Sequence, residues 1–329
     1  MKCTLPLPSI LLCGYARGGT TLLSEILRAN GYESGFECGV LLADKPSDFA
    51  KIEPYFNMLL GGWKISADIR REAINGDFRH FYSTLIGAAF SASDASGYFD
   101  KTPIYMQHLG KCLSRTDFIN KAIVITRDPR SVFVSMAKRL EPNISIEEAV
   151  TKRLNYLVDR YLSYFIGSIA HSNNENVLFV PFEELCSRED AILKTIGFFV
   201  EGKVFSKRQK ASAFVNVSSN GMDLSRISEF DRYLSPSLQK LILNRTRIAS
   251  PFFMNVSERI SLGDMHAETL NNIKKILRNF DLPQTGIIID GTYFEPMTYL
   301  LRYPDILAAK INPVKHFQRS GQKEKRIPC

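Results

Sequence analysis

The first residues that could do chemistry lie in the glycine-rich segment Gly14–Thr21, which reads Gly-Tyr-Ala-Arg-Gly-Gly-Thr-Thr. Its glycines let the backbone turn so that several N–H groups point at one anion, and a helix beginning directly after it adds a positive end. Thr20 and Thr21 supply hydroxyl donors, and Arg17 places a cation inside the loop. The segment therefore predicts a cradle for an anionic group.

One position separates this loop from the loops that bind nucleoside triphosphates. Their pattern, GxxxxGK[ST], requires Lys where this chain has Thr20. That Lys contacts the β- and γ-phosphates, and the residue after it binds Mg²⁺. Here the cation, Arg17, lies earlier in the loop and suits a single anionic group, with no evident demand for a metal. A phosphotransferase that uses ATP and Mg²⁺ is therefore a disfavoured alternative, and a non-catalytic nucleotide-binding module is another.

A second charged turn, Arg127-Asp-Pro-Arg, follows the apolar run Ala122–Thr126. Pro129 suits the first turn of a helix, so we expect Arg127 at the end of a strand. Ser135, eight residues after Arg127, would then lie two turns into that helix. An Arg and a hydroxyl placed in this way could hold one phosphate from two sides, the Arg bidentately.

Together these turns resemble the PAPS-dependent sulfotransferase family. The stretch that begins at Arg17, Arg-Gly-Gly-Thr-Thr-Leu-Leu, is similar to the family's 5′-phosphosulfate loop, in the Arg form of tyrosylprotein and many bacterial enzymes. Arg127 and Ser135 resemble its 3′-phosphate motif. Residues 180–187, Val-Pro-Phe-Glu-Glu-Leu-Cys-Ser, are similar to its Tyr-Glu-Asp-Leu segment. The resemblance covers residues 9–250.

The resemblance implies an enzyme that transfers a sulfuryl group from 3′-phosphoadenosine-5′-phosphosulfate (PAPS) to a hydroxyl or amine of a small-molecule acceptor. Loss of the sulfuryl group converts the donor to 3′-phosphoadenosine-5′-phosphate (PAP), and no metal is expected. The donor-binding residues that the resemblance implies are Arg17, Gly18, Gly19, Thr20, Thr21, Arg127, Ser135, Ser225 and Arg226. Lys207–Lys210 offers competing charge for the role of the last two.

In-line sulfuryl transfer also needs cations on the sulfuryl oxygens and a base for the acceptor's proton. Lys101, in Asp100-Lys-Thr-Pro, resembles the Lys that approaches the sulfuryl group in Golgi-type carbohydrate sulfotransferases. Pro103 stands where the cytosolic phenol and steroid enzymes have their His base. We therefore expect the base to come from another part of the chain.

Glu37 is our predicted base. It lies twenty residues after Arg17, and tyrosylprotein and heparan-type sulfotransferases have a catalytic Glu about that far past their loop cation. The chain thus resembles these Glu-base enzymes more than the His-base enzymes. Glu33 is a competing candidate, and His108, seven residues after Lys101, is a third.

The elements that must position these residues follow from the apolar pattern. Short apolar runs predict strands at Ser9–Cys13, Tyr98–Phe99, Ala122–Thr126 and Asn176–Val180. Helical spacing and capping signals predict helices from Leu22 to about Gly31, from Ser145 to Ile169, from Ser235 to Ile248 and over His266–Phe280. Strands alternating with helices predict an α/β fold, a P-loop-like three-layer domain whose central parallel sheet is flanked by helices. Ligands bind such sheets at the carboxyl ends of the strands.

The chain divides into three predicted parts. Residues 1–250 form the PAPS-binding domain, in which the aromatic-rich residues 40–95 could form a helical lid or acceptor-covering region, although the same aromatics could be helix core. Residues 251–314 form a C-terminal extension packed on or near the domain. Residues 315–329 form a basic tail, which carries five basic residues against one Glu and so half of the chain's net charge of +8.

Composition excludes several other classes of protein. The 329 residues are 45% hydrophobic and 23% charged, as in ordinary globular proteins. Six cysteines without CxxC spacing indicate neither a zinc site nor a disulfide framework. The chain lacks a long apolar run and a basic stripe with interleaved aromatics, so we expect a cytoplasmic protein without a membrane span or a nucleic-acid partner. Its expected partner is a small-molecule acceptor, such as a metabolite, a natural product or a lipid head group, and a homodimer is left open.

Overall fold

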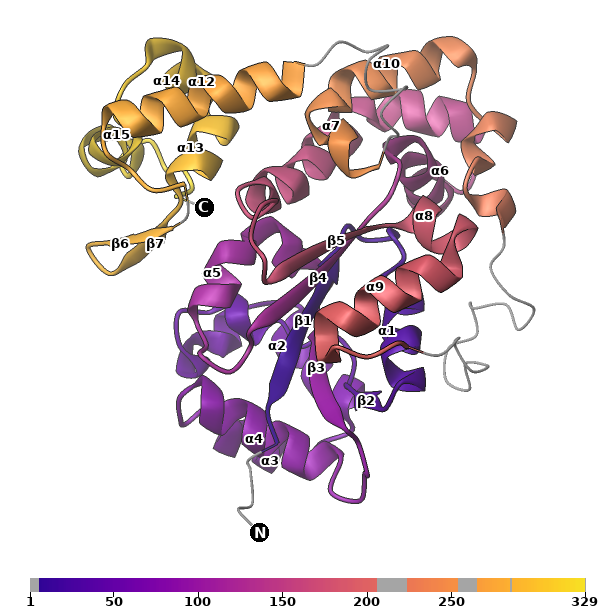
Figure 1. Cartoon of the computed structure of the whole chain (residues 1–329), viewed down its shortest axis with the longest axis vertical. Coiled ribbons are helices and arrows are strands. Elements are labelled where there is room, and N and C mark those ends of the chain that lie inside the picture. The colour runs from indigo at the N-terminus through magenta and orange to yellow at the C-terminus, as the bar shows by residue number, and fades with distance from the viewer. Residues whose placement is uncertain (1–5, 206–223, 254–264, 285, 329) are drawn as a thin grey trace. The chain divides into compact units, whose positions relative to one another are not determined.

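The computed structural model describes residues 6–205, 224–253, 265–284 and 286–328. The chain forms two compact units. The first comprises Met1–Tyr105, Cys112–Arg127 and Glu175–Glu229, and the second comprises Met106–Lys111, Asp128–Asn174 and Phe230–Cys329. Figure 1 shows the elements of both. Within the described part of the chain, no helix is long and apolar enough to cross a membrane.

The first unit contains a five-stranded sheet in the order β2-β3-β1-β4-β5. Its strands are β1 (Pro8–Gly14), β2 (Tyr32–Glu33), β3 (Gly97–Lys101), β4 (Lys121–Thr126) and β5 (Val177–Pro181). Every pair of neighbours is parallel. The predicted α/β fold with a central parallel sheet is therefore confirmed, and the four predicted strands are β1, β3, β4 and β5.

The remaining elements of the first unit are mostly helices. They are α1 (Thr20–Ala29), η1 (Val40–Leu42), η2 (Pro46–Lys51), α2 (Tyr55–Trp63), α3 (Ala67–Ala73), α4 (Phe78–Ala89), α8 (Phe182–Ser187), α9 (Glu189–Glu201) and η4 (Leu224–Arg226). η3 (Pro103–His108) and α5 (Leu109–Ser114) follow β3. The predicted first helix is α1, and Gly31, with φ 87°, follows its C-cap as expected.

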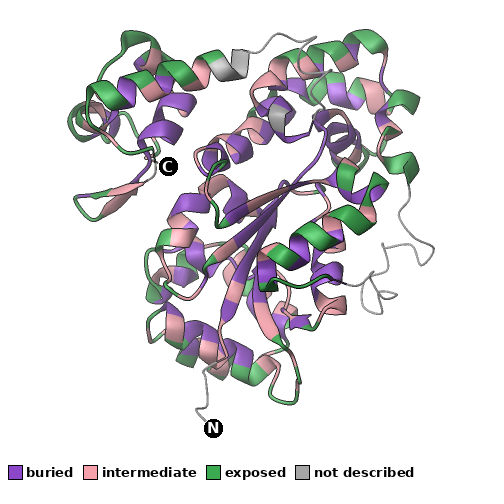
Figure 2. Cartoon of the chain, viewed as in Figure 1, coloured by how far each residue is buried: buried purple, intermediate pink, exposed green. Residues whose placement is uncertain are grey.

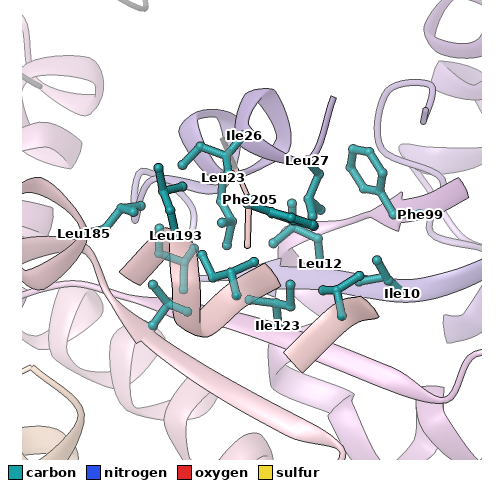
Figure 3. Packing of buried hydrophobic residues seen from close by; sticks show 14 of the residues in the cluster. Ile10, Leu12, Leu23, Ile26, Leu27, Phe99, Ile123, Leu185, Leu193 and Phe205 are labelled. Atoms are coloured by element: carbon teal, nitrogen blue, oxygen red, sulfur yellow. The ribbon is translucent and has the colours of Figure 1, made fainter. Parts of the chain in front are cut away.

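Apolar side chains on one face of the sheet pack against α1, α8 and α9. Because side chains alternate along a strand, Ile10 and Leu12 of β1 point to the same face. This cluster also contains Leu23, Ile26, Leu27, Phe99, Ile123, Leu185, Leu193, Ile196 and Phe205, all less than 4% exposed. Figure 3 shows most of these side chains meeting between the strands and helices. Truncating one such side chain to Ala typically costs about 2–5 kcal/mol.

On the opposite face of the sheet, α4 lies against β3. Phe99 points toward α1, so the next residue of β3, Asp100, points the other way, and the hydroxyl of Tyr82 on α4 donates to its carboxylate at 2.5 Å. Helices thus lie on both faces, which gives the predicted three layers. Figure 2 shows that the central strands are buried along most of their length.

Residues 40–95 contain the helical elements η1, η2, α2, α3 and α4. Phe49, Phe81 and Tyr82 are fully buried, and the rings of Phe49 and Phe81 meet edge to face with their centroids 5.7 Å apart. These three aromatics are therefore helix core. A covering role for this region over an acceptor remains a prediction.

In its described residues, the second unit is helical and contains the hairpin of β6 and β7. Its elements are α6 (Pro129–Leu140), α7 (Ile146–Ile169), α10 (Pro236–Thr246), η6 (Arg247–Phe252), α12 (Met265–Asn279), β6 (Ile287–Ile289), β7 (Thr292–Phe294), α13 (Pro296–Arg302), α14 (Pro304–Ala309), α15 (Pro313–His316) and η7 (Phe317–Gly321). η5 (Glu229–Arg232) precedes α10. Predicted starts are confirmed for α6, where Pro129 is the first residue, and for α7, where the Ser145 hydroxyl accepts from the Glu148 N–H.

Part of the predicted basic tail is tied to its neighbours. η7 lies within it, and the Arg326 guanidinium donates to both carboxylate oxygens of Asp305, on α14, at 2.9 and 2.8 Å. These contacts are made at the surface, where a single ion pair contributes little to stability.

Candidate active site

Three of the predicted turns lie at one edge of the sheet. β1 is central, and in its parallel register Leu12 pairs with Lys101 of β3 and Gly14 pairs with Ile125 of β4. Parallel strands present their carboxyl ends at the same edge. β3, β1 and β4 are neighbours in the sheet (Figure 1). Lys101 at the end of β3, the loop Gly14–Thr21 after β1 and Arg127 after β4 are therefore all at this edge.

The loop after β1 needs its glycines because the chain passes close to neighbouring groups. A Cβ on Gly14 would lie 2.5 Å from the carbonyl oxygen of Ile125. Gly19 has φ 107°, and its Cβ would lie 2.7 Å from the ring of Phe182. The Gly18 N–H closes the turn on the carbonyl of Tyr15 at 2.8 Å. Glycine is thus required for the path of the loop, independently of any ligand.

The loop leads directly into the N-terminus of α1. Thr20 and Thr21 are the first two residues of this ten-residue helix, and Gly19 is its N-cap. Gly19 has no side chain to accept a hydrogen bond, and the first turn of α1 contains no acidic residue. The first N–H groups of a helix have no partner within it, and they carry partial positive charge. This end of α1 therefore suits an anion.

Arg127 connects the loop to a third segment of the chain. Its Nη1 donates to the carbonyl of Arg17 at 3.0 Å, and its Nη2 donates to the carbonyl of Arg226 at 2.9 Å. Its guanidinium carbon lies 4.4 Å from the centroid of the Phe182 ring. Arg127 is 7% exposed, and burial lowers its pKa, while the charge of Glu183 opposes that shift. The structure thus brings Arg17, Arg127 and Arg226 together.

Two other predicted donor-binding residues lie on separate helices. Ser225 lies on η4, the short turn that also contains Arg226. Lys207–Lys210, the competing basic segment, lies outside the described part of the chain. Ser135 lies on α6 in the second unit, two turns from its start. A clamp formed by Ser135 and Arg127 remains a prediction.

Lys101 and Glu37, the two residues predicted to act on the sulfuryl group and the acceptor, are in contact. The Nζ of Lys101 lies 3.4 Å from Oε1 of Glu37 and 4.4 Å from the centroid of the Phe36 ring. Lys101 is 5% exposed. Burial lowers its pKa, because desolvation disfavours the ammonium, and the carboxylate of Glu37 opposes this shift.

Backbone hydrogen bonds hold the segment that carries Glu37. The Cys38 and Gly39 N–H groups both donate to the hydroxyl of Thr102, at 2.9 and 3.2 Å. The Phe36 N–H donates to the carbonyl of Gly62 at 2.9 Å. Further back, Nη2 of Arg28 donates to the carbonyl of Ser34 at 2.9 Å. Residues on both sides of Glu37 are therefore anchored.

Asp100, which sequence reasoning missed, lies at the centre of a buried polar cluster. Its carboxylate accepts from the hydroxyls of Tyr82, Tyr105 and Thr102 at 2.5, 3.1 and 2.8 Å. Burial raises its pKa to about 6, and the three hydroxyl donors oppose that shift. The predicted strand Tyr98–Phe99 ended one residue short of Asp100. Alternation carried one residue further would have placed the Asp100 side chain on the face opposite that of Phe99.

The competing base candidates lie elsewhere. Glu33 is in β2 and pairs with Tyr98, three residues before Lys101 on β3, so it lies back from the carboxyl edge of the sheet. His108 belongs to the second unit, where burial, aided by the charges of Arg302 and Lys111, lowers its pKa to about 4. Among the residues that the structure describes, no group of three His, Cys, Asp or Glu side chains could hold a metal ion.

Comparisons with known proteins place this arrangement in a family. Residues 7–235 match the family model described as the sulfotransferase domain. The sulfotransferase domain from the Synechococcus PCC 7002 olefin synthase is 15% identical, with a TM-score of 0.54 over 78% of this chain and 98% of that one. The sulfotransferase domain from the curacin biosynthetic pathway is 16% identical, with a TM-score of 0.47 over 74% of this chain and 99% of that one. No curated protein matches the sequence. Since the family model spans more than half of the chain, this protein belongs to the sulfotransferase domain family.

Proposed function

We propose that this sulfotransferase transfers the sulfuryl group of PAPS to a hydroxyl or amine of a small-molecule acceptor, with Glu37 as the general base. The observation that carries the proposal is the contact between Lys101 and Glu37. Lys101 is the last residue of β3, and the end of this strand adjoins the loop after β1. A cation, a carboxylate and a phosphate cradle are the three groups that the reaction needs.

The donor binds, in this proposal, along the carboxyl edge of the sheet. Gly18 and Gly19, with the hydroxyls of Thr20 and Thr21, hold the 5′-phosphosulfate at the start of α1. Support comes from the first turn of that helix, which contains neither an acidic residue nor a side-chain cap. Arg17 adds charge to the loop.

The 3′-phosphate binds next to Arg127. The buried guanidinium is held by the carbonyls of Arg17 and Arg226, so it links the loop to η4. In this proposal Ser225 and Arg226 contribute from η4, and the family resemblance implies Ser135 as a further donor. A fixed, planar, permanently charged group is well suited to a phosphate.

Chemistry then proceeds by in-line displacement at sulfur. Glu37 accepts the proton of the acceptor's hydroxyl or amine while the acceptor atom attacks the sulfur. The bond between that sulfur and the bridging phosphate oxygen breaks, and PAP leaves with the bonding electron pair. The Lys101 ammonium and Arg17 stabilise the negative charge on the sulfuryl oxygens and on the leaving phosphate. Atoms and charge balance without a metal or an oxidant.

A binding experiment tests the donor assignment. Isothermal titration and thermal unfolding would be measured with PAP, with AMP, which lacks only the 3′-phosphate, and with ATP plus Mg²⁺. At a hundredfold excess over its Kd, a ligand stabilises the folded state by about 2.7 kcal/mol. We expect PAP to bind more tightly than AMP. Stabilisation by ATP with Mg²⁺ and none by PAP would instead support the phosphotransferase alternative.

A turnover experiment tests the reaction itself. Radiolabelled PAPS would be incubated with the enzyme and a panel of small alcohols, phenols and amines, and labelled products would be separated from the donor. The acceptors that become labelled define the substrate class, including whether oxygen or nitrogen is sulfated. Binding of PAP without label transfer to any acceptor or to water would contradict the catalytic assignment of Glu37 and Lys101 and favour a binding module.

A further inference from the structure

Asp100 is fully buried at the end of β3, and its position calls for an explanation. Burying a carboxylate is costly unless its oxygens are hydrogen-bonded, and a well-packed apolar side chain would usually be as stable or more so. Phe99, its neighbour on the same strand, is such an apolar side chain. Three hydroxyl donors, from Tyr82, Thr102 and Tyr105, offset the cost at Asp100. This buried position thus contains a hydrogen-bonded polar cluster in place of apolar side chains.

The hydroxyl of Thr102 is oriented by this carboxylate. A hydroxyl has one hydrogen to donate and two lone pairs that accept. Its hydrogen is directed to Oδ1 of Asp100 at 2.8 Å. The lone pairs then face the N–H groups of Cys38 and Gly39, at 2.9 and 3.2 Å. With the carboxylate in place, the Thr102 hydroxyl therefore has all its hydrogen bonds, and its acceptor side is turned toward the Glu37 segment.

A second contact ties the same carboxylate to the next part of that segment. The Tyr105 hydroxyl donates to Oδ2 of Asp100 at 3.1 Å and accepts from the Leu41 N–H at 3.3 Å. The N–H groups of residues 38, 39 and 41 are thus all held through hydroxyls that donate to one buried carboxylate. Glu37 is the residue directly before this anchored stretch.

We propose that Asp100 and Thr102 are positioning residues for sulfuryl transfer, because together they fix the backbone after Glu37 and so hold its carboxylate against the Nζ of Lys101. Lys101 lies between them in sequence, so three consecutive residues at the end of β3 and directly after it supply the cation and both of the groups that hold its partner. The inference rests on the proposed role of Glu37 as the base.

The test compares Thr102→Val with Thr102→Ser. Valine keeps the shape of the side chain and removes its hydrogen bonds, whereas serine keeps the hydroxyl. Misplacing a catalytic group by about 1 Å can cost on the order of 100-fold in rate. We expect Thr102→Val to lower kcat by about 10- to 100-fold while the Kd for PAP stays within about twofold, and we expect Thr102→Ser to restore most of kcat.

Thr246→Val is the matched control. Thr246 is also fully buried, and its hydroxyl donates to the carbonyl of Ile242 within α10, in the second unit. The Thr246→Val variant also loses a buried hydroxyl, but that hydroxyl does not hold the Glu37 segment. Its kcat should therefore stay near that of the wild type. If Thr102→Val does not fold, Tyr105→Phe provides the measurement instead, since it removes one donor to Asp100 and the acceptor of the Leu41 N–H. The same fall in kcat at unchanged PAP affinity is expected.

Two outcomes separate this inference from the proposed function. Wild-type kcat in Thr102→Val, or in Tyr105→Phe where it replaces that variant, with little activity in Glu37→Gln would overturn the positioning role and leave Glu37 as the base. Wild-type kcat in Glu37→Gln would overturn the base assignment, and with it this inference. A loss of kcat that serine does not restore at position 102 would also count against the hydroxyl's role.

Discussion

The Nζ of Lys101 and Oε1 of Glu37 lie 3.4 Å apart, although 64 residues separate them in the chain. The two partners differ in exposure, since the side chain of Lys101 is 6% exposed and that of Glu37 is 20% exposed. The carboxylate thus lies on the accessible side of the pair, with the ammonium behind it. This order suits a base that must reach an incoming acceptor and a cation that must stay in a site of low polarity, where its charge acts more strongly.

Replacing Glu37 with Gln should abolish most of the turnover and leave donor binding intact. Gln keeps the size and can still contact Lys101, but it cannot accept the acceptor's proton. General base catalysis typically contributes about 10²- to 10⁴-fold, so we expect a loss of kcat in that range. Initial rates with labelled PAPS measure kcat, and titration measures the Kd for PAP. Glu33→Gln is the matched control and should retain activity; the reverse pattern would make Glu33 the base.

Replacing Lys101 with Met should lower kcat by about 10²- to 10³-fold, because a cation on the reacting oxygens is lost while the volume of the side chain is kept. Lys101→Arg should not restore the rate, since the planar guanidinium cannot replace a compact ammonium in a buried site. Lys45→Met, at an exposed position, serves as the control. Equal rates for the Lys101→Met variant and this control would exclude a catalytic role for the ammonium.

The same lysine predicts where activity falls at high pH. Burial lowers the pKa of Lys101 below its ordinary value of 10.5. The protonated form is the active one, so the rate should fall as the pH rises through a pKa below 10.5. A rate profile between pH 7 and pH 10.5, measured at saturating PAPS, checks this. A plateau that extends to the top of that range would contradict the assignment.

Several parts of this site could be predicted because short sequence patterns determine the strands, turns and helix starts that hold them. The apolar runs of β1 and β4, the Gly-rich turn and the Pro at the start of α6 each act within a few residues, and the parallel sheet then brings their ends together. Glu37 was reached through family resemblance, since no local pattern distinguishes it from Glu33. The two glutamates differ only in the folded structure, where Glu33 of β2 pairs with Tyr98 of β3. β2 has two residues, which is too short for the alternating pattern of a strand to be recognised in the sequence.

The cluster around Asp100 could not be predicted in the same way. Thr102 contacts Cys38 and Gly39 across more than 60 residues of chain, and Tyr82 comes from a helix on the far face of the sheet. Alternation along β3 shows that Asp100 and Phe99 face opposite layers. It does not show that hydroxyls from three other positions meet that carboxylate.

Arg127 should be needed for tight binding of PAP, and Lys should not be able to replace it. Its two terminal nitrogens contact two separate carbonyls, at Arg17 and Arg226, which the single ammonium of Lys cannot do in that geometry. We expect Arg127→Ala and Arg127→Lys to weaken PAP binding at least tenfold, by titration. The preference for PAP over AMP should also shrink, because the 3′-phosphate is the group that distinguishes the two. A uniform loss for both ligands would point to a role in loop structure alone.

Gly19→Ala should destabilise the fold as well as the donor site. The left-handed φ of 107° and a Cβ only 2.7 Å from the Phe182 ring both oppose a side chain there. We expect a loss of about 1–3 kcal/mol in the free energy of unfolding, measured with denaturant. Gly87→Ala is the matched control. Gly87 lies within α4, and a Cβ there meets nothing within 4 Å, so Ala should stabilise the helix by about 0.5–1 kcal/mol.

Asp100 predicts a pH dependence of stability with a definite sign. Its pKa is about 6 in the folded protein and near 3.8 when exposed. Because the folded state holds the proton more tightly, the stability that this group contributes is full below pH 3.8 and is lost as the pH rises through 6. A difference of about two pKa units corresponds to about 3 kcal/mol. Asp100→Asn does not titrate, so its stability relative to the wild type should rise by about that amount between pH 4 and pH 7.

An exposed aspartate supplies the opposite case for the same measurement. Hydrogen bonds from Arg326 hold the pKa of Asp305 below its usual value. The stability that Asp305 contributes is therefore present above pH 3.8 and is lost as the pH falls through its lowered pKa. Relative to the wild type, Asp305→Asn should become more stable toward acid, whereas Asp100→Asn should become more stable toward neutral pH. Denaturant unfolding of the three proteins at several pH values measures both trends, and parallel curves for the two variants would show that the Asp100 carboxyl is not the titrating group.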